Sequence, residues 1–460
     1  MRHTPVTCEQ REAMLRAVGM TETAELFADI PHEVRLGRPL EVDGGLPEME
    51  LVSELRRLAG TNRPAGGMVS FAGAGCYDHY VPAIVDHVLR KPEFFTAYTP
   101  YQPEVSQGTL QAIYEYQSIV CALTGMDVAN ASMYDGATAF VEGAMMACRV
   151  TRRTRVVCAG TVHPQWQRTL QTYADAGTFD VTFLQPDGSG RALSADDPMR
   201  IADELAAGDV AALLVASPNV YGNLEDVREA ARLAHEAGAL LVAAANPLLL
   251  SVLEAPGEAG ADIVVGEGQP LGNAMSYGGP AFGFFAARQE HVRHMPGRLV
   301  GRTVDVDGNQ AFVLTLSTRE QHIRRERSTS NICSNQALCA LAAAVHVCAL
   351  GREGLVQTAR AAIAKTHYLR EQLLATGRFT APWDAPFAHE FALAYEGDVD
   401  AMYGAMLDRG FLAGVPASRL ECEAVGGFDP DRLGQLVVFA VTERRTRAEM
   451  DAFVKEVSAL

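Results

Sequence analysis

The middle of the chain alternates between short apolar runs and amphipathic segments. Five apolar runs have the length of buried strands: RVVCAG, DVTFLQ, VAALLVASPN, ALLVAAAN and ADIVVG. Segments with helical spacing of apolar residues, each of roughly 10 to 15 residues, separate the first four of these runs. Because strands that alternate with helices form βαβ units, we expect an α/β fold with a mostly parallel sheet that helices cover on both faces.

The segments on either side of this block predict two further parts. Residues 1–65 show helix-like apolar spacing interrupted by Pro and Gly, which predicts an N-terminal helical arm. Residues 66–325 would form the large α/β domain, and residues 326–460 a linking helix and a smaller C-terminal α/β domain. We expect the linking helix to begin near Ser330 and Asn331.

Composition narrows the classes of partner. The formal net charge is -17, and affinity for a phosphate backbone comes mainly from clustered basic residues, so we expect no nucleic-acid partner. The apolar stretch at residues 338–350 is shorter than the ~20 residues that a membrane span needs, so we expect no membrane segment. The N-terminus lacks the apolar core of a signal peptide, and the nine cysteines include no CxxC pair. These features predict a cytoplasmic protein without a metal site.

The segment SMYDGATAF predicts a helix that begins after small residues. Small side chains let backbone N–H groups approach an anion, and the N-terminus of a helix adds partial positive charge. A phosphate could therefore bind here. Alternatively, Asp135 is a plain helix cap, which is the commoner use of Asp before a helix. The residues of this candidate site are Ser132, Asp135, Gly136, Ala137 and Thr138.

Two polar residues come directly after predicted strands. His163 follows RVVCAG and precedes a helix, so its imidazole could stack on a flat heterocycle, transfer a proton, or only cap the helix. Asn246 ends the run ALLVAAAN, where it could line a site or act as a turn residue before Pro247.

A basic segment lies between residues 319 and 327. Guanidinium groups bind carboxylates or phosphates with two parallel hydrogen bonds, so this segment could form an anion site. In so acidic a chain it could also make ion pairs with acidic neighbours or with a partner subunit. The candidate residues are Arg319, His322, Arg324, Arg325 and Arg327.

Several longer motifs resemble one enzyme family. They are YTPYQPEVSQGTLQAIYEYQSIVCALTGMDVANASMYDGATAFVEGAMMA, MSYGGP, RHMPGRLVGRTVDVDG and TREQHIRRERSTSNICSNQAL. Together they closely resemble the glycine decarboxylase, or P-protein, of the glycine cleavage system, and in particular its alpha subunit. The resemblance runs from about residue 1 to the C-terminus.

The resemblance implies a fold-type-I pyridoxal-phosphate-dependent transferase-like architecture. It also implies a glycine dehydrogenase (aminomethyl-transferring, decarboxylating) that is active only as a complex with a beta subunit, most simply two alpha and two beta chains. This oxidoreductase of glycine catabolism decarboxylates glycine, releases CO2 and transfers the aminomethyl group to the lipoyl arm of the H-protein. Because the beta subunit carries the Schiff-base lysine, pyridoxal phosphate is expected there and not covalently on this chain.

The loop that would carry the Schiff-base lysine in this fold has no lysine. After ADIVVG it offers Gln269 and Pro270, and neither has the primary amine that a Schiff base requires. A carboxylate at the position of Asn246 would hold the pyridine nitrogen protonated, and Asn cannot supply that charge. We therefore expect a vestigial cofactor site. The chain's lysines all lie outside residues 92–364, at Lys91, Lys365 and Lys455.

The tyrosine loop, residues 98–104, is expected to line the active site of a partner subunit, because fold-type-I enzymes build their sites at a dimer interface. Its side chains could also only cement that interface, as Tyr-rich loops often do. Two other functions stay open: an independent pyridoxal-phosphate enzyme with its lysine elsewhere, and a non-catalytic structural or regulatory subunit. The candidate residues of the loop are Tyr98, Tyr101, Gln102 and Glu104.

Overall fold

A computed structural model of the chain describes residues 5–185, 188–193, 199–332, 334–420 and 434–460. The chain divides into two compact units, Met1–Arg63 and Pro64–Leu460. The boundaries expected after residues 65 and 325 stay predictions.

The first unit consists of short helices without a hydrophobic core. Helix α1 (Cys8–Ala17) begins after Thr7, whose hydroxyl accepts the N–H of Gln10 at 3.2 Å in a capping box. Among the described residues of this unit, Leu15 is the one buried side chain. The helices expected from apolar spacing are therefore present, but their apolar side chains remain exposed. The other elements are the 3-10 turns η1 (Thr23–Phe27) and η2 (His32–Val34) and helix α2 (Glu48–Ala59).

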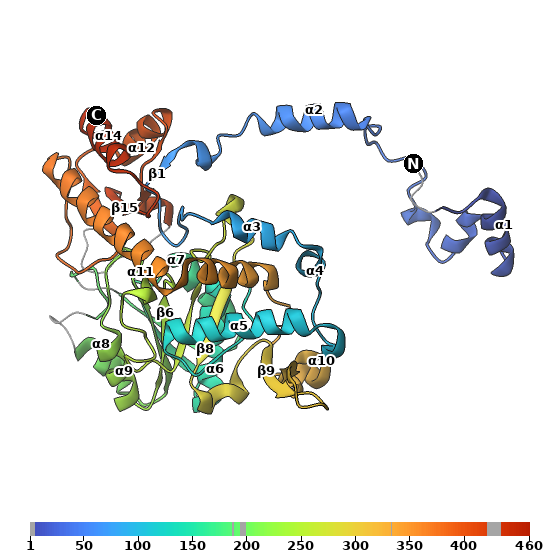
Figure 1. The fold of residues 1–460 in the computed structure, drawn as a ribbon, viewed down its shortest axis with the longest axis horizontal. Coiled ribbons are helices and arrows are strands. Elements are labelled where there is room, and N and C mark those ends of the chain that lie inside the picture. Colours follow the sequence, from blue (N-terminus) through green and yellow to red (C-terminus); the bar gives the residue numbers. More distant parts are fainter. Residues whose placement is uncertain (1–4, 186–187, 194–198, 333, 421–433) are drawn as a thin grey trace. The chain divides into compact units, whose positions relative to one another are not determined.

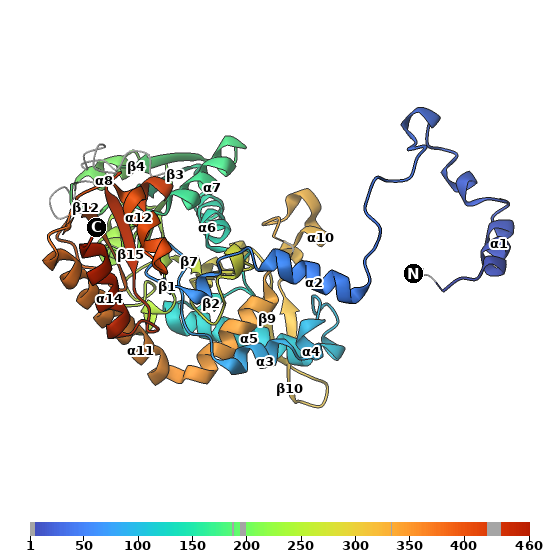
Figure 2. The same ribbon diagram turned by 90° about the horizontal axis from the view of Figure 1, so that it is seen from above.

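The second unit is built on a seven-stranded sheet with the order β2-β8-β7-β6-β5-β3-β4 (Figures 1 and 2). Strands β3 to β7 run parallel, while β8 is antiparallel to both β7 and β2. The predicted strands are all present, and the prediction of a mostly parallel sheet is confirmed. The strands are β2 (Val128–Ala129), β3 (Arg155–Ala159), β4 (Asp180–Leu184), β5 (Val210–Ser217), β6 (Leu240–Ala245), β7 (Ile263–Glu267) and β8 (Gly283–Ala287).

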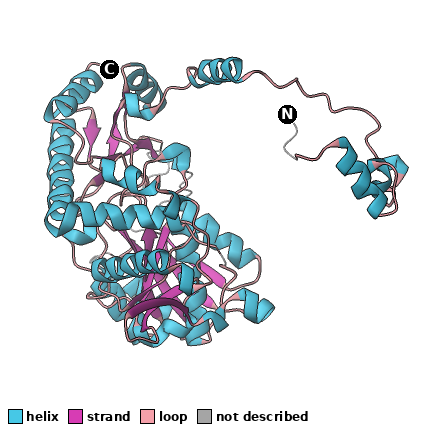
Figure 3. Ribbon diagram, turned by 45° about the vertical axis from the view of Figure 1, so that its right-hand side comes forward, coloured by secondary structure: helices cyan, strands magenta, loops and turns pink. Residues whose placement is uncertain are grey.

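Helices surround the strands of this sheet (Figure 3). Helix α6 packs on β5 to β8, helix α9 on β5 and β6, and helix α5 on β2 and β8. Residues 210–216 of β5 are all buried, as expected of a strand with both faces covered. The helices are α5 (Gln107–Thr124), α6 (Gly136–Thr151), α7 (Pro164–Asp175), α8 (Met199–Leu205) and α9 (Val227–Glu236).

A second, antiparallel sheet with the order β11-β12-β15-β14 forms the C-terminal part. Its core is aromatic. The ring centroids of Phe391 and Phe439 lie 5.5 Å apart in a stacked arrangement, and those of Phe71 and Phe453 lie 4.5 Å apart. Strand β1 (Val69–Ser70) pairs in parallel with β13 (Phe411–Leu412), so the start of the second unit packs with this sheet. The remaining elements are β11 (Phe379–Thr380), β12 (Glu390–Tyr395), β14 (Val415–Pro416), β15 (Leu436–Ala440), α11 (Ala337–Ala375), α12 (Val399–Asp408) and α14 (Arg447–Ser458).

A β-hairpin that the apolar pattern did not predict lies beside helix α5. Its strands β9 (Leu299–Val304) and β10 (Gln310–Thr315) are antiparallel, and Phe312 packs with Leu110 of α5. At the turn, the Asp305 carboxylate accepts the backbone N–H of Asn309 at 2.8 Å. The short helices of this part of the unit are α3 (Ala83–Leu89), α4 (Pro92–Phe95) and α10 (Gln321–Arg324).

The expected start of the linking helix near Ser330 and Asn331 is wrong, because α11 begins later. The Ser330 hydroxyl donates to the Glu142 carboxylate at 2.9 Å, and the Asn335 amide donates to the Ser132 hydroxyl at 2.8 Å. These side chains therefore hold their backbone in a loop through contacts with residues far away in the sequence. Local apolar spacing carries no trace of such contacts.

Among the described residues, α11 is the one helix long and apolar enough to cross a membrane by length and composition. Its backbone is broken at Gly351, where φ is 63°. Cys339, Ala340 and Ala343 near its beginning are buried in the hydrophobic core of the main sheet. These features are typical of a core helix in a packed globular unit.

The Gly222→Ala substitution tests the close contact between the loop after β5 and strand β12, which belongs to the second sheet. Gly222 follows β5 with φ at +83°, and a Cβ there would overlap the carbonyl oxygen of Glu390 in β12. We expect a loss of roughly 2 to 5 kcal/mol of unfolding free energy, because left-handed strain and overpacking add. The matched control is Gly208→Ala, which has φ at +73° and open space around the Cβ, and should cost about 1 kcal/mol. Equal thermal midpoints for the two variants would contradict this account.

Candidate functional site

A cavity of about 560 Å³ opens at the carboxyl ends of the parallel strands. This edge of an open α/β sheet is where ligands generally bind. Its wall includes residues that follow β3, β5, β6 and β7, the beginning of α6, the segment 74–77 and Glu390 of β12. The loop after β7, rich in glycine, closes one side of the cavity with residues 274–279.

The structure brings some of the predicted site residues together at this cavity and leaves others away from it. Gly136 and Thr138 belong to the first turn of α6, next to the lining residues Asp135 and Ala137, while Ser132 precedes that helix and does not line the cavity. Tyr98, Tyr101, Gln102, Glu104, Arg319, His322, Arg324 and Arg325 are not among its described lining residues. The predicted residues in its wall are Asp135, Ala137, His163, Asn246, Gln269 and Pro270.

Two carboxylates of this chain occupy the N-terminus of helix α6. Asp135 is the N-cap, and its carboxylate accepts the backbone N–H of Thr138 at 2.7 Å, so the capping interpretation is confirmed. The Glu267 carboxylate accepts the backbone N–H of Gly136 at 3.0 Å. Two of the backbone donors that could bind a phosphate at this helix terminus, those of Gly136 and Thr138, are therefore bound within the chain.

Glu267 is a site residue that the sequence analysis missed. Its second carboxylate oxygen accepts the backbone N–H of Gln269 at 3.0 Å and that of Phe282 at 3.3 Å. Burial raises the pKa of its carboxyl group to about 7, although these donors oppose the shift. The available signal was an acid at the end of the apolar run ADIVVGE, directly before the glycine-rich loop.

Gln269 has a structural role at the position where the fold suggests a lysine. Its amide oxygen accepts the N–H of Tyr77 at 3.0 Å, and its amide nitrogen donates to the carbonyl oxygen of Tyr77 at 3.0 Å. The same nitrogen donates to the carbonyl oxygen of Asn273 at 2.7 Å. Gln269 is 3% exposed, so it fastens the segment 74–77 to the loop after β7.

Glu390 binds the same segment from the C-terminal sheet, and the sequence analysis missed it as well. Its carboxylate accepts the phenol O–H of Tyr77 at 3.0 Å and the backbone N–H of Ala74. Burial raises the pKa of Glu390 to about 7. An acid as the first residue of the buried strand EFALAY was the only local signal.

His163 and Asn246 are held by local contacts. His163 caps helix α7, where its Nδ1 accepts the N–H of Gln165 at 3.2 Å, and burial lowers the pKa of its imidazole. The Asn246 side-chain oxygen accepts the N–H of Leu248 at 3.0 Å, which is the turn contact considered from sequence. Its amide nitrogen lies 3.3 Å from Nε2 of His389, whose pKa burial lowers to about 3. A neutral His389 can accept that hydrogen bond.

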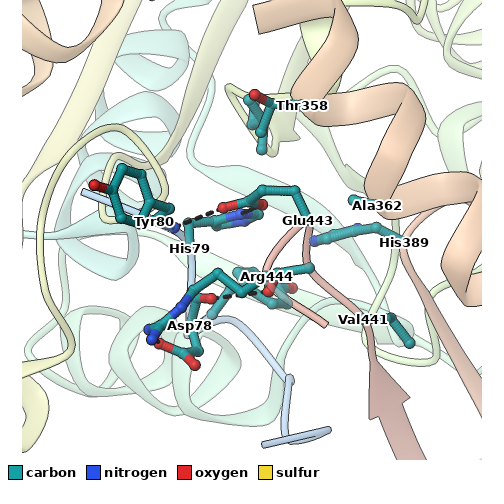
Figure 4. A network of polar contacts seen from close by, with 12 residues as sticks. Asp78, His79, Tyr80, Thr358, Ala362, His389, Val441, Glu443 and Arg444 are labelled. Carbon is teal, nitrogen blue, oxygen red and sulfur yellow. Dashed lines mark hydrogen bonds and ion pairs between the residues drawn. The ribbon is translucent and has the colours of Figure 1, made fainter. Parts of the chain in front are cut away.

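A polar network connects residues 78–80 to the residues that follow β15 (Figure 4). Nδ1 of His79 lies 2.7 Å from the Glu443 carboxylate, which also accepts the N–H of Tyr80 at 2.6 Å. Asp78 pairs with Arg444, and its carbonyl oxygen accepts the hydroxyl of Thr442 at 2.8 Å. These contacts hold residues 78–80 to the segment after β15, next to the part of the chain that carries Tyr77.

The tyrosine loop belongs to a different cluster of the same unit. The Arg298 guanidinium donates to the phenol oxygen of Tyr101 at 2.9 Å and lies 3.5 Å from the Glu320 carboxylate. Nδ1 of His322 also lies 3.5 Å from Glu320, and the Tyr98 side chain is 82% exposed. The sequence analysis missed Arg298, which stands in the quoted motif PGRLVG. This cluster presents two tyrosines and a histidine at the surface.

The predicted basic segment does not form one site. The Arg319 guanidinium is buried and donates to the backbone carbonyl oxygens of Met295 and Gly297, the latter at 3.1 Å. Arg324, the last residue of α10, and Arg325, which follows it, are both exposed. Arg325 adopts a φ of 54°, which ends that short helix. Of these four candidate residues, His322 alone contacts the tyrosine-loop cluster, through Glu320.

The cavity does not fit pyridoxal phosphate, the cofactor that the resemblance implies for this fold. The loop on which the resemblance implies a Schiff-base lysine lines the cavity with Gln269 and Pro270, neither of which has an amine, and Asn246 at the end of β6 has no carboxylate for the pyridine nitrogen. The N-terminus of α6 is bound by Asp135 and Glu267. A phosphate there would meet two carboxylates instead of free donors.

The pH dependence of stability tests the burial of Glu390. Its pKa of about 7 in the folded chain, against 4.5 for an ordinary carboxyl group, means that the folded state binds its proton more tightly. The raised pKa contributes roughly 3 kcal/mol to the free energy of unfolding. This contribution is fully present below pH 4.5 and is lost as the pH rises through 7. Glu390→Gln cannot ionise, so we expect the thermal midpoint of this variant to change less between pH 5 and 8 than that of the wild type. Glu371→Gln, exposed on α11, should keep the wild-type profile, and an identical profile for Glu390→Gln would contradict the assignment.

The chain is similar over its full length to proteins of one family. Residues 1–414 match the family model of the glycine cleavage system P-protein. The probable glycine dehydrogenase (decarboxylating) subunit 1 of Desulforamulus reducens is 46% identical over 460 residues, 100% of both chains. The protein of the same name from Chlorobium luteolum is 48% identical over 456 residues, 99% of this chain and 98% of that protein.

Solved structures support the same assignment. A glycine decarboxylase (P-protein) of the glycine cleavage system, in inhibitor-bound form, superposes with a TM-score of 0.89 at 42% identity over 100% of both chains. Glutamate decarboxylase from Lactobacillus brevis gives a TM-score of 0.65 at 12% identity over 95% of this chain and 96% of that chain, which shows a common fold alone. The predicted fold-type-I architecture is confirmed. The chain belongs to the P-protein family of the glycine cleavage system.

Proposed function

We propose that this chain is the alpha subunit of a glycine decarboxylase. With a beta subunit it would decarboxylate glycine, release CO2 and transfer the aminomethyl group to the lipoyl arm of the H-protein. One observation carries the proposal: relatives named subunit 1 match the whole chain, while its own cavity has Gln269 in place of an amine. The pyridoxal phosphate of the complex then binds to the lysine of the beta subunit.

Assembly with a beta subunit is favoured by the first unit. Along α2, the apolar side chains Met49, Val52 and Leu55 recur every three residues and are 82%, 38% and 55% exposed. Such a stripe is typical of a helix face that packs against another surface. We propose a complex of two alpha and two beta chains, since closed symmetric assemblies are the commonest. We also propose that this complex acts in the cytoplasm.

The tyrosine loop is the part of this chain that we assign to the active site of the partner. Pro100 and Pro103 restrict its backbone, which reduces the entropy lost on ordering. The Arg298 guanidinium, which pairs with Glu320, donates to the phenol of Tyr101, while Tyr98 is exposed. A stiff loop of this kind can present phenols to a bound amino acid across an interface.

Reconstitution tests the function. We expect glycine decarboxylation, measured as release of labelled CO2, only when this chain, the beta subunit, the H-protein and pyridoxal phosphate are combined. Borohydride reduction of this chain with pyridoxal phosphate should label no specific lysine, because the cavity offers no amine. Stoichiometric label on Lys91, Lys365 or Lys455 would favour an independent enzyme, and full activity of the beta subunit alone would favour a non-catalytic role.

Substitutions in the tyrosine loop test whether its phenols take part in turnover. We expect Tyr98→Phe or Tyr101→Phe to lower glycine turnover by roughly one to two orders of magnitude, since a lost hydrogen bond in the transition state costs a few kcal/mol. Assembly, measured by sedimentation, should stay intact. Tyr114→Phe is the matched control, because that ring packs on Phe312 within the hairpin contact. Unimpaired turnover in both loop variants would mean that the phenols take no part in turnover and that the loop only contributes to the interface.

A further inference from the structure

The anion-binding position at the beginning of α6 is already filled. Three backbone N–H groups from separate segments converge on the Glu267 carboxylate: those of Gly136, Gln269 and Phe282, at 3.0, 3.0 and 3.3 Å. A helix N-terminus together with neighbouring loop amides is the arrangement that commonly binds a phosphate. Here a side chain of the protein takes all three donors.

The backbone on either side of the Glu267 carboxylate is tightly packed. A Cβ on Gly136 would overlap the Trp166 ring and lie 2.9 Å from the backbone nitrogen of Glu267. A Cβ on Gly268 would overlap the ring of Phe282. Trp166 and Phe282 therefore pack against the backbone next to Glu267, which lines the cavity.

The ionisable residues that line the cavity also disfavour a ligand with a phosphate group. Asp135, Glu267 and Glu390 line it, and none of its described lining residues is a lysine or an arginine. His163 does not compensate, because burial lowers the pKa of its imidazole and favours the neutral form. A ligand with a phosphate group would therefore enter a cavity that offers it carboxylates and no cation.

We infer that Glu267 is a built-in replacement for the cofactor's phosphate: its carboxylate satisfies the helix α6 terminus and closes the cavity to phosphate-bearing ligands. Gln269 completes the replacement, because its amide binds both the N–H and the carbonyl oxygen of Tyr77 where a Schiff-base lysine would otherwise stand. The inference rests on the proposed function in one respect, which is that the cofactor of the complex binds to another chain.

Removing the carboxylate should reopen the anion site. In the Glu267→Ala variant of the full chain, the donors of Gly136, Gln269 and Phe282 are freed next to the cavity. We expect inorganic phosphate and pyridoxal phosphate to bind this variant at least tenfold more tightly than the wild type. The measurements are isothermal titration at matched ionic strength and the dose-dependent rise of the thermal midpoint, neither of which depends on enzyme activity.

Two further variants separate this inference from a general effect of charge. Glu390→Gln removes a carboxylate from the same cavity without touching α6, so it should gain no comparable affinity. Glu267→Gln removes the charge but keeps the volume, so it should gain less than Glu267→Ala. If Glu267→Ala does not fold, Glu267→Gln decides by the same comparison: a gain over Glu390→Gln supports the inference and no gain overturns it.

The inference fails if the wild-type chain binds either probe as tightly as Glu267→Ala, or if the folded variant gains nothing. It also fails if Glu390→Gln gains as much, because the site would then be set by net charge alone. These outcomes are separate from those of the reconstitution, in which the beta subunit supplies the cofactor site. Absence of glycine turnover would overturn the proposed function and leave the anion measurements valid.

Discussion

The buried carboxylate of Glu267 is the constraint on which the site depends. A carboxyl group taken from water into a protein interior is costly unless hydrogen bonds compensate it. Glu267 finds its donors at the beginning of α6, in the loop after β7 and at the beginning of β8. Because each donor belongs to a different element, satisfying one charge fixes the relative positions of three backbone segments at the carboxyl edge of the sheet.

The segment 74–77 extends this constraint to the C-terminal sheet. Its Tyr77 is held from the main sheet by the amide of Gln269 and from strand β12 by the carboxylate of Glu390. The next residues continue the connection, since His79 binds Glu443 after β15. A short stretch of irregular backbone therefore joins both sheets through buried polar contacts. Such contacts fix a geometry, because each unpaired partner would carry the full cost of desolvation.

Sequence reasoning reached the parts of this structure that local patterns encode. The apolar runs gave the parallel strands, and the Asp135 cap and the turn at Asn246 follow from residue chemistry at element ends. The missed residues, Glu267, Glu390 and Arg298, acquire their roles from partners far away in the sequence. The late beginning of α11 has the same origin, because Ser330 binds Glu142. Spacing within a window records none of these long-range contacts.

The replacements in the cavity follow a physical rule. A lysine at position 269 without a bound aldehyde would be a buried ammonium group among backbone carbonyl oxygens, and an aspartate at position 246 would face a neutral histidine. Gln269 and Asn246 have similar size and reach but no charge, and each finds a donor and an acceptor in place. The backbone N–H groups of Gly136, Gln269 and Phe282, by contrast, still need an acceptor. The Glu267 carboxyl group provides that acceptor, so a side chain of this chain holds the beginning of α6 and the loop after β7 in place.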